Sequence, residues 1–135
     1  MRSRGFTLLE VMIVCAIVAI LAAIAYPSYK NSIQKSRRSD ATTALLGVAS
    51  QMERYSTEKG TYATATLGTG AGAVFANHTE NSYYNLSLAN LTATTYTVRA
   101  APTGAQADDP CGTLTYNEQG FKDVSGGSWT RARCW

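Results

Sequence analysis

Side chains of the types that act in catalysis or bind metals are scarce in this sequence, and their spacing offers few candidate catalytic or metal sites. The one histidine, His78, has no cysteine or acid at metal-ligand spacing, so we expect it to face solvent. Asp108 and Asp109 could begin a calcium loop, but two carboxylates fall well short of the roughly six oxygens that calcium takes. A solvated turn before Pro110 is the favoured interpretation. Without a G-x-S-x-G nucleophile motif, the sequence favours neither an enzyme nor a bound metal or other cofactor.

Two cysteines near the end of the chain are the clearest candidates for a covalent bond. A disulfide between Cys111 and Cys134 would stabilise the fold by about 3 kcal/mol in the chain-entropy model. Such a bond needs an oxidising compartment, the periplasm or the exterior, and the alternative is two unrelated buried thiols. Cys15 differs from both, because it lies in an apolar stretch where a small hydrophobic residue is the simpler explanation.

That apolar stretch runs from Phe6 to Tyr26 and carries a single charged side chain, Glu10. A helix of this length spans about 30 Å, the thickness of a bilayer's hydrocarbon core. It could be a secretory signal cleaved after Ala25, a plain membrane anchor, or a retained helix behind a short basic leader cut after Gly5. Glu10 favours the retained helix, because an ionisable group inside a membrane span is costly and marks a site.

The helical pattern continues beyond the apolar stretch, which predicts one long helix. Residues 30–40 are polar and lack Gly and Pro, and Gly60 is a reasonable helix stop. Pro27 removes one backbone donor, so we expect a kink near this residue. The positions that follow the i, i+3, i+4, i+7 spacing of an amphipathic helix are Ala41, Ala44, Leu45, Val48, Ala49, Met52 and Tyr55.

The rest of the chain predicts a small antiparallel sheet. Residues 61–82 are rich in Thr, Ala and Gly and predict a surface loop; their G-x-G-x-G spacing lacks the strand and helix that flank a phosphate-binding loop. The strands expected after this loop are Tyr83–Ala89, Thr94–Ala101, Gly112–Tyr116 and Phe121–Val124, with turns at Asn90–Ala93 and Asn117–Gly120. The expected fold class is α+β, with the long N-terminal helix packed on the sheet and a disulfide-closed C-terminal loop.

Composition agrees with one folded domain. The chain has 135 residues, of which 45% are apolar and 16% charged. A disordered chain would be more polar and more highly charged. The formal net charge of +3 argues little for a nucleic-acid partner.

The N-terminal residues carry a family resemblance. The run from Gly5 to Glu10, followed by an apolar helix with Pro27 near its end, resembles the N-terminal signature of type IV prepilins. A looser likeness continues through Tyr55 to Tyr62 and the C-terminal cysteine pair, and it resembles the small minor pilins of Gram-negative bacteria. Type II secretion pseudopilins share the same N-terminal signature.

The resemblance implies a set of roles and boundaries. A membrane peptidase would cut between Gly5 and Phe6 and methylate the amino group of Phe6, and Glu10 would pair with that amine and set the register between subunits. A capping box over Thr7–Glu10 is an alternative reason for the acid. The implied domains are a leader at 1–5, a transmembrane and filament-core helix at 6–29, and a globular part at 30–135. The globular part divides into helix 30–59, loop 60–82, sheet 83–124 and disulfide-bounded region 111–134.

The implied function is structural: a subunit, expected to be a minor one, of a type IV pilus that supports assembly, motility, adhesion or DNA uptake. Its expected partners are other pilin subunits, the prepilin peptidase, the inner-membrane assembly machinery and, before assembly, membrane lipid. The globular part would face the periplasm first and the extracellular fibre later. The alternatives are a type II secretion pseudopilin and an adhesive or DNA-binding competence pilin.

The last residues suggest a partner surface. If the tail is extended, Trp129, Arg131, Arg133 and Trp135 point one way and Cys134 points the other. Three interpretations stay open: stacking of Arg on Trp within the chain, a contact between subunits, or a DNA surface with Arg on phosphates and Trp on bases. Few basic residues follow Lys59, so the support for DNA is thin.

Overall fold

The computed structural model describes residues 5–135, which form two compact units. The first unit ends at Lys35, and the second, here called the head, is Ser36–Trp135. Helix α1, Leu8–Lys59, belongs to both units. Of the predicted leader, residues 1–4 lie outside the described residues. The helix assignment continues through Pro27, and the expected kink there stays a prediction.

The first unit is a helix without a core of its own. Every residue from 5 to 32 is exposed, including large apolar side chains such as Leu9, Ile13 and Ile20. The described residues include one helix, α1, that is long and apolar enough to cross a membrane, and none of its apolar window is buried. Apolar surface of this extent needs either lipid or other apolar helices around it.

The head's part of α1 is amphipathic, as its apolar spacing predicts. The predicted core positions are all buried except Tyr55, which is half-buried; the buried ones are Ala41, Ala44, Leu45, Val48, Ala49 and Met52. Gly60 follows the helix with φ +73°, and its amide donates to the Ser56 carbonyl at 2.7 Å. This left-handed residue ends α1 at the predicted stop, because glycine adopts it without steric cost.

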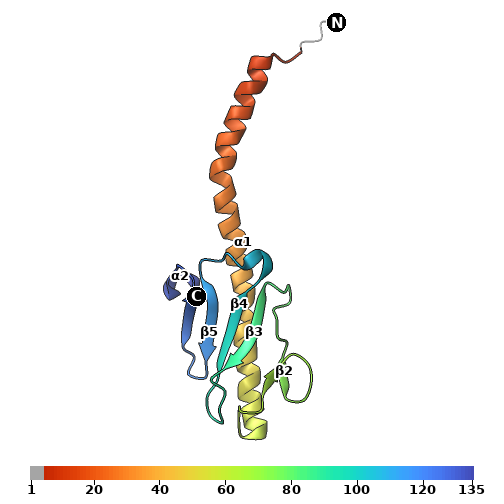
Figure 1. Ribbon diagram of the computed structural model, residues 1–135, viewed down its shortest axis with the longest axis vertical. Helices are drawn as coiled ribbons and strands as arrows, with labels where there is room; N and C mark the ends of the chain where they lie inside the picture. The colour runs from red at the N-terminus through yellow and green to blue at the C-terminus, as the bar shows by residue number, and fades with distance from the viewer. Residues whose placement is uncertain (1–4) are drawn as a thin grey trace. The chain divides into compact units, whose positions relative to one another are not determined.

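Four antiparallel strands form the sheet of the head in the order β3-β4-β5-β6 (Figure 1). Their bounds are Tyr84–Ala89 for β3, Thr97–Pro102 for β4, Gly112–Asn117 for β5 and Lys122–Gly126 for β6. The four predicted strands are confirmed, with ends shifted by up to three residues. β4 begins later than expected because the Thr95 amide donates to Thr92 Oγ1 at 3.0 Å and prolongs the turn. The buried row Leu86–Ala100–Leu114, continued by half-buried Val124, runs across all four strands.

The predicted surface loop is more ordered than its composition suggests. It contains two short parallel strands, β1 (Thr66–Leu67) and β2 (Ala73–Phe75). Tyr62, Ala65 and Thr79 are buried, so the segment contributes to the core of the head, and the prediction that all of 61–82 is a surface loop is wrong. Gly72 has φ +78°, and a Cβ there would lie 2.5 Å from the Thr64 carbonyl oxygen. A tight turn between β1 and β2 therefore requires this glycine.

The C-terminal tail is held by one covalent bond and a short helix. Cys111 and Cys134 form a disulfide with an S–S distance of 2.01 Å, which confirms the predicted pairing. The expectation of an extended tail is wrong, because α2, Arg131–Cys134, forms a helical turn. The Arg133 amide donates to the Thr130 carbonyl, and the Trp135 amide donates to the Arg131 carbonyl. A 3₁₀ turn, η1 (Gly104–Gln106), connects β4 toward β5.

Candidate functional site

The start of α1 places the prepilin-type residues at an exposed helix terminus. The Glu10 amide donates to Thr7 Oγ1 at 3.2 Å, so Thr7 caps the helix. This cap uses the backbone of Glu10 and does not require its carboxylate. Phe6, Glu10, Val11, Val14 and Cys15 line a shallow apolar pocket of about 230 Å³. An acid beside an apolar surface of this kind can receive a cationic group that arrives together with apolar atoms.

The head contains an ion pair between α1 and the segment before β5. Arg38 Nε donates to Asp109 Oδ2 at 3.0 Å and Arg38 Nη2 donates to Asp109 Oδ1 at 2.8 Å. Both residues are buried, at 5% and 4% exposure. The two parallel bonds are the strong, geometrically specific form of an Arg–carboxylate pair. The prediction that Asp109 lies in a solvated turn is therefore wrong, while Asp108 is exposed as expected.

Further donors converge on the same carboxylate. Tyr84 Oη donates to Asp109 Oδ2 at 2.7 Å, and Gln106 Nε2 donates to the same oxygen at 2.7 Å. The Cys111 amide donates to Oδ1 at 3.0 Å. Burial by itself raises the pKa of the Asp109 carboxyl, but the hydrogen bonds from Arg38 and these groups outweigh it and hold that pKa below its ordinary value. Burial, followed by the neighbouring Asp109, raises the pKa of the Tyr84 phenol.

Helix periodicity already contained a signal for this pair. Arg38 precedes Ala41 and Leu45 by three and seven residues, so it lies on the buried stripe of α1. A buried guanidinium needs an acidic partner, since an unpaired buried charge is strongly destabilising. The apolar stripe predicted from the sequence begins at Ala41 and does not include Arg38, so the pair was not predicted. Which acid would pair with Arg38 could not be read from the sequence, because Asp109 lies 71 residues away.

The same region anchors the disulfide. The Pro110 carbonyl accepts from the Ser128 amide at 2.8 Å and from the Trp129 amide at 2.9 Å. At Gly127 a Cβ would lie 2.3 Å from the Pro110 oxygen, so the two cysteine-bearing segments approach too closely for any other residue. Asp109 fixes the Cys111 amide on one side of this junction. The ion pair and the disulfide therefore stabilise the same junction of the head, where the segment before β5 meets the C-terminal tail.

The four tail residues do not share one face. Arg133 lies over the Trp129 ring at 3.7 Å, and Arg38 lies over the same ring at 5.4 Å. The interpretation of Arg stacking on Trp within the chain is confirmed for this pair. Trp135 instead turns to β6, where its Nε1 donates to the Asp123 carbonyl at 3.0 Å.

A basic–aromatic cluster forms where α2 meets β6, and we define it as Phe121, Lys122, Arg131 and Trp135. Arg131 lies over the Phe121 ring at 5.1 Å, and Lys122 lies over the Trp135 ring at 5.0 Å. Phe121, Lys122, Arg131 and Trp135 line a shallow pocket of about 300 Å³. The two cations of the cluster, Lys122 and Arg131, are exposed, and each is held over an aromatic ring of the cluster.

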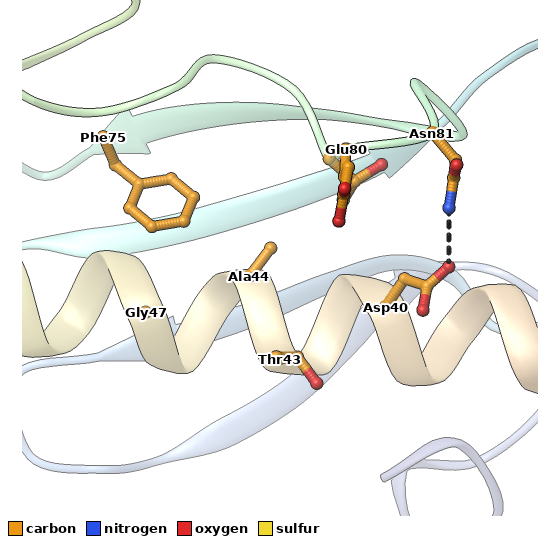
Figure 2. A pocket seen from close by; sticks show the side chains of 8 residues that line it. Asp40, Thr43, Ala44, Gly47, Phe75, Glu80 and Asn81 are labelled. Carbon is orange, nitrogen blue, oxygen red and sulfur yellow. Dashed lines mark hydrogen bonds between the residues drawn. The ribbon is translucent and has the colours of Figure 1, made fainter.

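An acidic groove lies between α1 and the segment that joins β2 to β3 (Figure 2). Its volume is about 410 Å³, and its lining residues are Asp40, Thr43, Ala44, Gly47, Phe75, Thr79, Glu80 and Asn81. Asn81 Nδ2 donates to Asp40 Oδ2 at 3.4 Å across one end. Asp40 and Glu80 are exposed, whereas Ala44 is buried beneath them. His78 is exposed beside this segment, as predicted, and the described residues contain no cluster of three metal-ligating side chains.

Comparisons with known proteins agree with these features. Residues 27–115 match a family model described as "Type IV minor pilin ComP, DNA uptake sequence receptor", and residues 1–26 match the prokaryotic N-terminal methylation motif. The chain is 39% identical over 70 residues to fimbrial protein EcpC of Eikenella corrodens, covering 52% of this chain and 46% of that protein. It is 34% identical over 70 residues to type II secretion system core protein G of Dickeya chrysanthemi, with the same coverage. The chain thus spans about half the length of the curated relatives it matches.

A solved structure supports the same fold. The non-core minor pilin PilV of Neisseria meningitidis superposes with a TM-score of 0.57 at 27% sequence identity. The similarity covers 74% of this chain and 94% of that chain. The likeness therefore includes most of the head.

Proposed function

Because this chain belongs to the type IV minor pilin family whose model matches residues 27–115, we propose that it is a structural subunit of a type IV pilus. The observation that carries the proposal is the exposed apolar helix: no residue of its apolar window is buried. Such a helix is stable in lipid before assembly and among the helices of other subunits afterwards. The head, with a core of its own, would face the periplasm first and the surface of the fibre later.

Processing at the N-terminus prepares the helix for the filament. We propose that the prepilin peptidase cuts between Gly5 and Phe6 and that the Phe6 amine is methylated, with the inner-membrane machinery then extracting the subunit. The methylation-motif match over residues 1–26 and the exposure of Gly5 and Phe6 support this step. Glu10 then pairs with the Phe6 amine of a neighbouring subunit, which compensates a charge that hydrocarbon alone would not tolerate.

Electron microscopy of a deletion strain tests the structural role. Absent or sparse pili, restored by a plasmid copy of the gene, are the expected result. Normal pili together with lost protein secretion would instead assign the chain to a type II secretion pseudopilus, which the similarity to core protein G keeps as the alternative. A deletion strain with normal pili and normal protein secretion would count against both the pilus and the pseudopilus assignment.

DNA binding is a second candidate function, and the description of the matching family favours it. On this chain the exposed tail cations Arg131 and Arg133 lie beyond residue 115, outside the matched range. Arg131→Ala with Arg133→Ala tests them, because phosphate contacts would be lost while the disulfide stays intact. Lost DNA uptake with normal pili would favour DNA, whereas lost pili with a stable head would favour a subunit contact.

A further inference from the structure

Charge in the head is balanced in number but separated in space. Between residues 36 and 135 the chain has eight basic and eight acidic side chains. The exposed cations Lys122, Arg131 and Arg133 gather at α2 and β6, and the exposed acids Asp40 and Glu80 border the acidic groove. Figure 1 places α2 and β2 on opposite flanks of the head, and β2 contributes Phe75 to the groove. The head therefore presents a positive flank and a negative one without net charge to repel a second copy.

The acidic groove has the shape and chemistry to take a long cationic side chain. Figure 2 shows Phe75 and Glu80 facing Ala44 across the groove, with Asp40 at the end that Asn81 closes. The Phe75 ring approaches so closely that a Cβ on Gly47 would lie 3.0 Å from it, which leaves this wall apolar and flat. The methylene groups of an Arg or Lys could lie along Phe75 while its charged end reaches Asp40 and Glu80.

The basic–aromatic cluster offers such side chains in a fixed arrangement. The disulfide at Cys134 anchors α2, and the Trp135 indole bonded to the Asp123 carbonyl anchors its end to β6. Arg131 Nη1 also donates to the Lys122 carbonyl at 3.4 Å. Among the described residues, Lys122, Arg131 and Arg133 form no ion pair. Cations held over aromatic rings lose less freedom on docking than free surface side chains do.

We propose that the acidic groove of one head receives the basic–aromatic cluster of the next copy of this chain. The two surfaces differ and lie on opposite flanks, so the contact is heterologous and each head keeps one surface for a further copy. Repeated contacts of this kind build an open helical chain, the symmetry of a filament. The inference rests on the proposed pilus function, since that function places copies of this chain in the same filament. A cluster seated in a groove is covered, so it cannot bind DNA in the same head.

Charge reversal in the full-length chain tests the contact. Asp40→Lys with Glu80→Lys reverses the groove, and Lys122→Glu with Arg131→Glu reverses the cluster. Each strain also carries Ala132→Cys, which lines the pocket of the cluster, and Asn81→Cys, which lines the groove. Both changes are made in a Cys15→Ala background, so that neighbouring heads in sheared pili can be linked by oxidation. We expect linked copies of this chain in the parent, at least about a tenfold loss with either reversal, and recovery when both reversals are combined. Ser87→Cys on the outer face of β3, in place of Asn81→Cys, is the matched control and should give no links.

Each other outcome counts against the contact. If reversing the groove does not rescue the cluster reversal, and DNA capture is lost, the cluster binds DNA and not a second head. Disulfide links from the cysteine at position 81 to a pilin of different mass would show that the groove binds another kind of subunit. Pili that contain the chain without linked copies overturn this contact alone, whereas a chain missing from purified pili overturns the proposed function as well.

Discussion

The two units of the chain remove their apolar side chains from water in different ways. In the head, α1 and the sheet bury a shared core that includes Leu45, Met52 and Leu114. In the first unit, residues of similar size such as Leu9 and Ile20 are 68% and 64% exposed. Burying one such side chain is worth about 1.5–3 kcal/mol. The head can therefore fold from its own contacts, while the first unit obtains its stability from lipid or from other helices.

The same contrast holds for charge. Asp109 is compensated inside the head by Arg38, Tyr84 and Gln106. In the apolar part of α1, Glu10 is exposed, and the bond at its position uses its amide. A buried charge must have its partner at the moment of burial. For Asp109 that moment is folding; for Glu10 we propose that it is assembly. Mutations in the two units should therefore separate folding from assembly.

Blocking the leader cut should have the largest effect. Gly5→Leu places a bulky side chain where the peptidase must approach the backbone, and we expect no cleavage and no pili. The head should fold as before, because it contains none of these residues. Intact mass spectrometry of the membrane fraction checks cleavage, with Gly5→Ala as the matched mild change. A mature N-terminus at Tyr26 would show instead that residues 1–25 are an ordinary signal peptide.

Removing the Glu10 charge should abolish assembly while sparing the cleavage and the head. Glu10→Gln keeps a side chain of the same size and leaves the Thr7 cap on the backbone amide unchanged. We expect at least about a tenfold loss of pili, since the Phe6 amine would enter the filament core uncompensated. Thr7→Ala is the matched control and should cost about 1 kcal/mol of helix stability. Normal piliation by Glu10→Gln together with a defect in Thr7→Ala would assign this region to capping.

In the head, breaking the buried ion pair should cost the most stability. Arg38→Met leaves the Asp109 carboxylate buried without its guanidinium, at an expected cost of about 3–5 kcal/mol in the free energy of unfolding. Arg38→Met combined with Asp109→Leu removes both charges and should recover part of that loss. Thermal unfolding of the full-length chain in detergent measures both variants. Equal stability of wild type and Arg38→Met would mean that the pair contributes nothing.

Removing the disulfide should cost somewhat less. Cys134→Ser opens the loop back to Cys111, with an expected loss of about 3 kcal/mol. The helix of the first unit contains neither cysteine, so membrane insertion should be unchanged. Immunoblots of membrane fractions should therefore show a normal inserted precursor and a lower steady-state level of the mature chain. Cys15→Ser, in the exposed apolar helix, is the control expected to leave the head's stability unchanged.

The sequence predicted the regular elements of the head better than its buried polar contacts. The helix, the four strands and the disulfide follow from apolar periodicity, turn residues and cysteine number, which are local signals. The Arg38–Asp109 pair depends on a tertiary contact between distant segments, and no local signal selects Asp109 over Asp108. The tail shows the same limit. Alternation predicts one shared face for Trp129 and Trp135, but α2 turns them to different neighbours.

Acid should weaken the head through Asp109, and this is the smallest effect expected. Its pKa is lowered in the folded head, so the unfolded chain takes up the proton first as pH falls below about 4. The stability that the ionised carboxylate contributes is complete above that pH and is lost as pH falls through the folded pKa.

Asp109→Asn tests this linkage through the slope of stability against pH. The variant cannot ionise, so it should be less stable than wild type at pH 7 and should approach wild type as the pH falls toward 3. Glu58→Gln, an exposed acid on α1 with only a long contact to Arg54, is the matched control and should keep the wild-type slope. Parallel curves for wild type and Asp109→Asn would show that the acid sensitivity of the head comes from other carboxylates. Convergence would instead tie it to the one acid that holds α1 and the cysteine-bearing segment together.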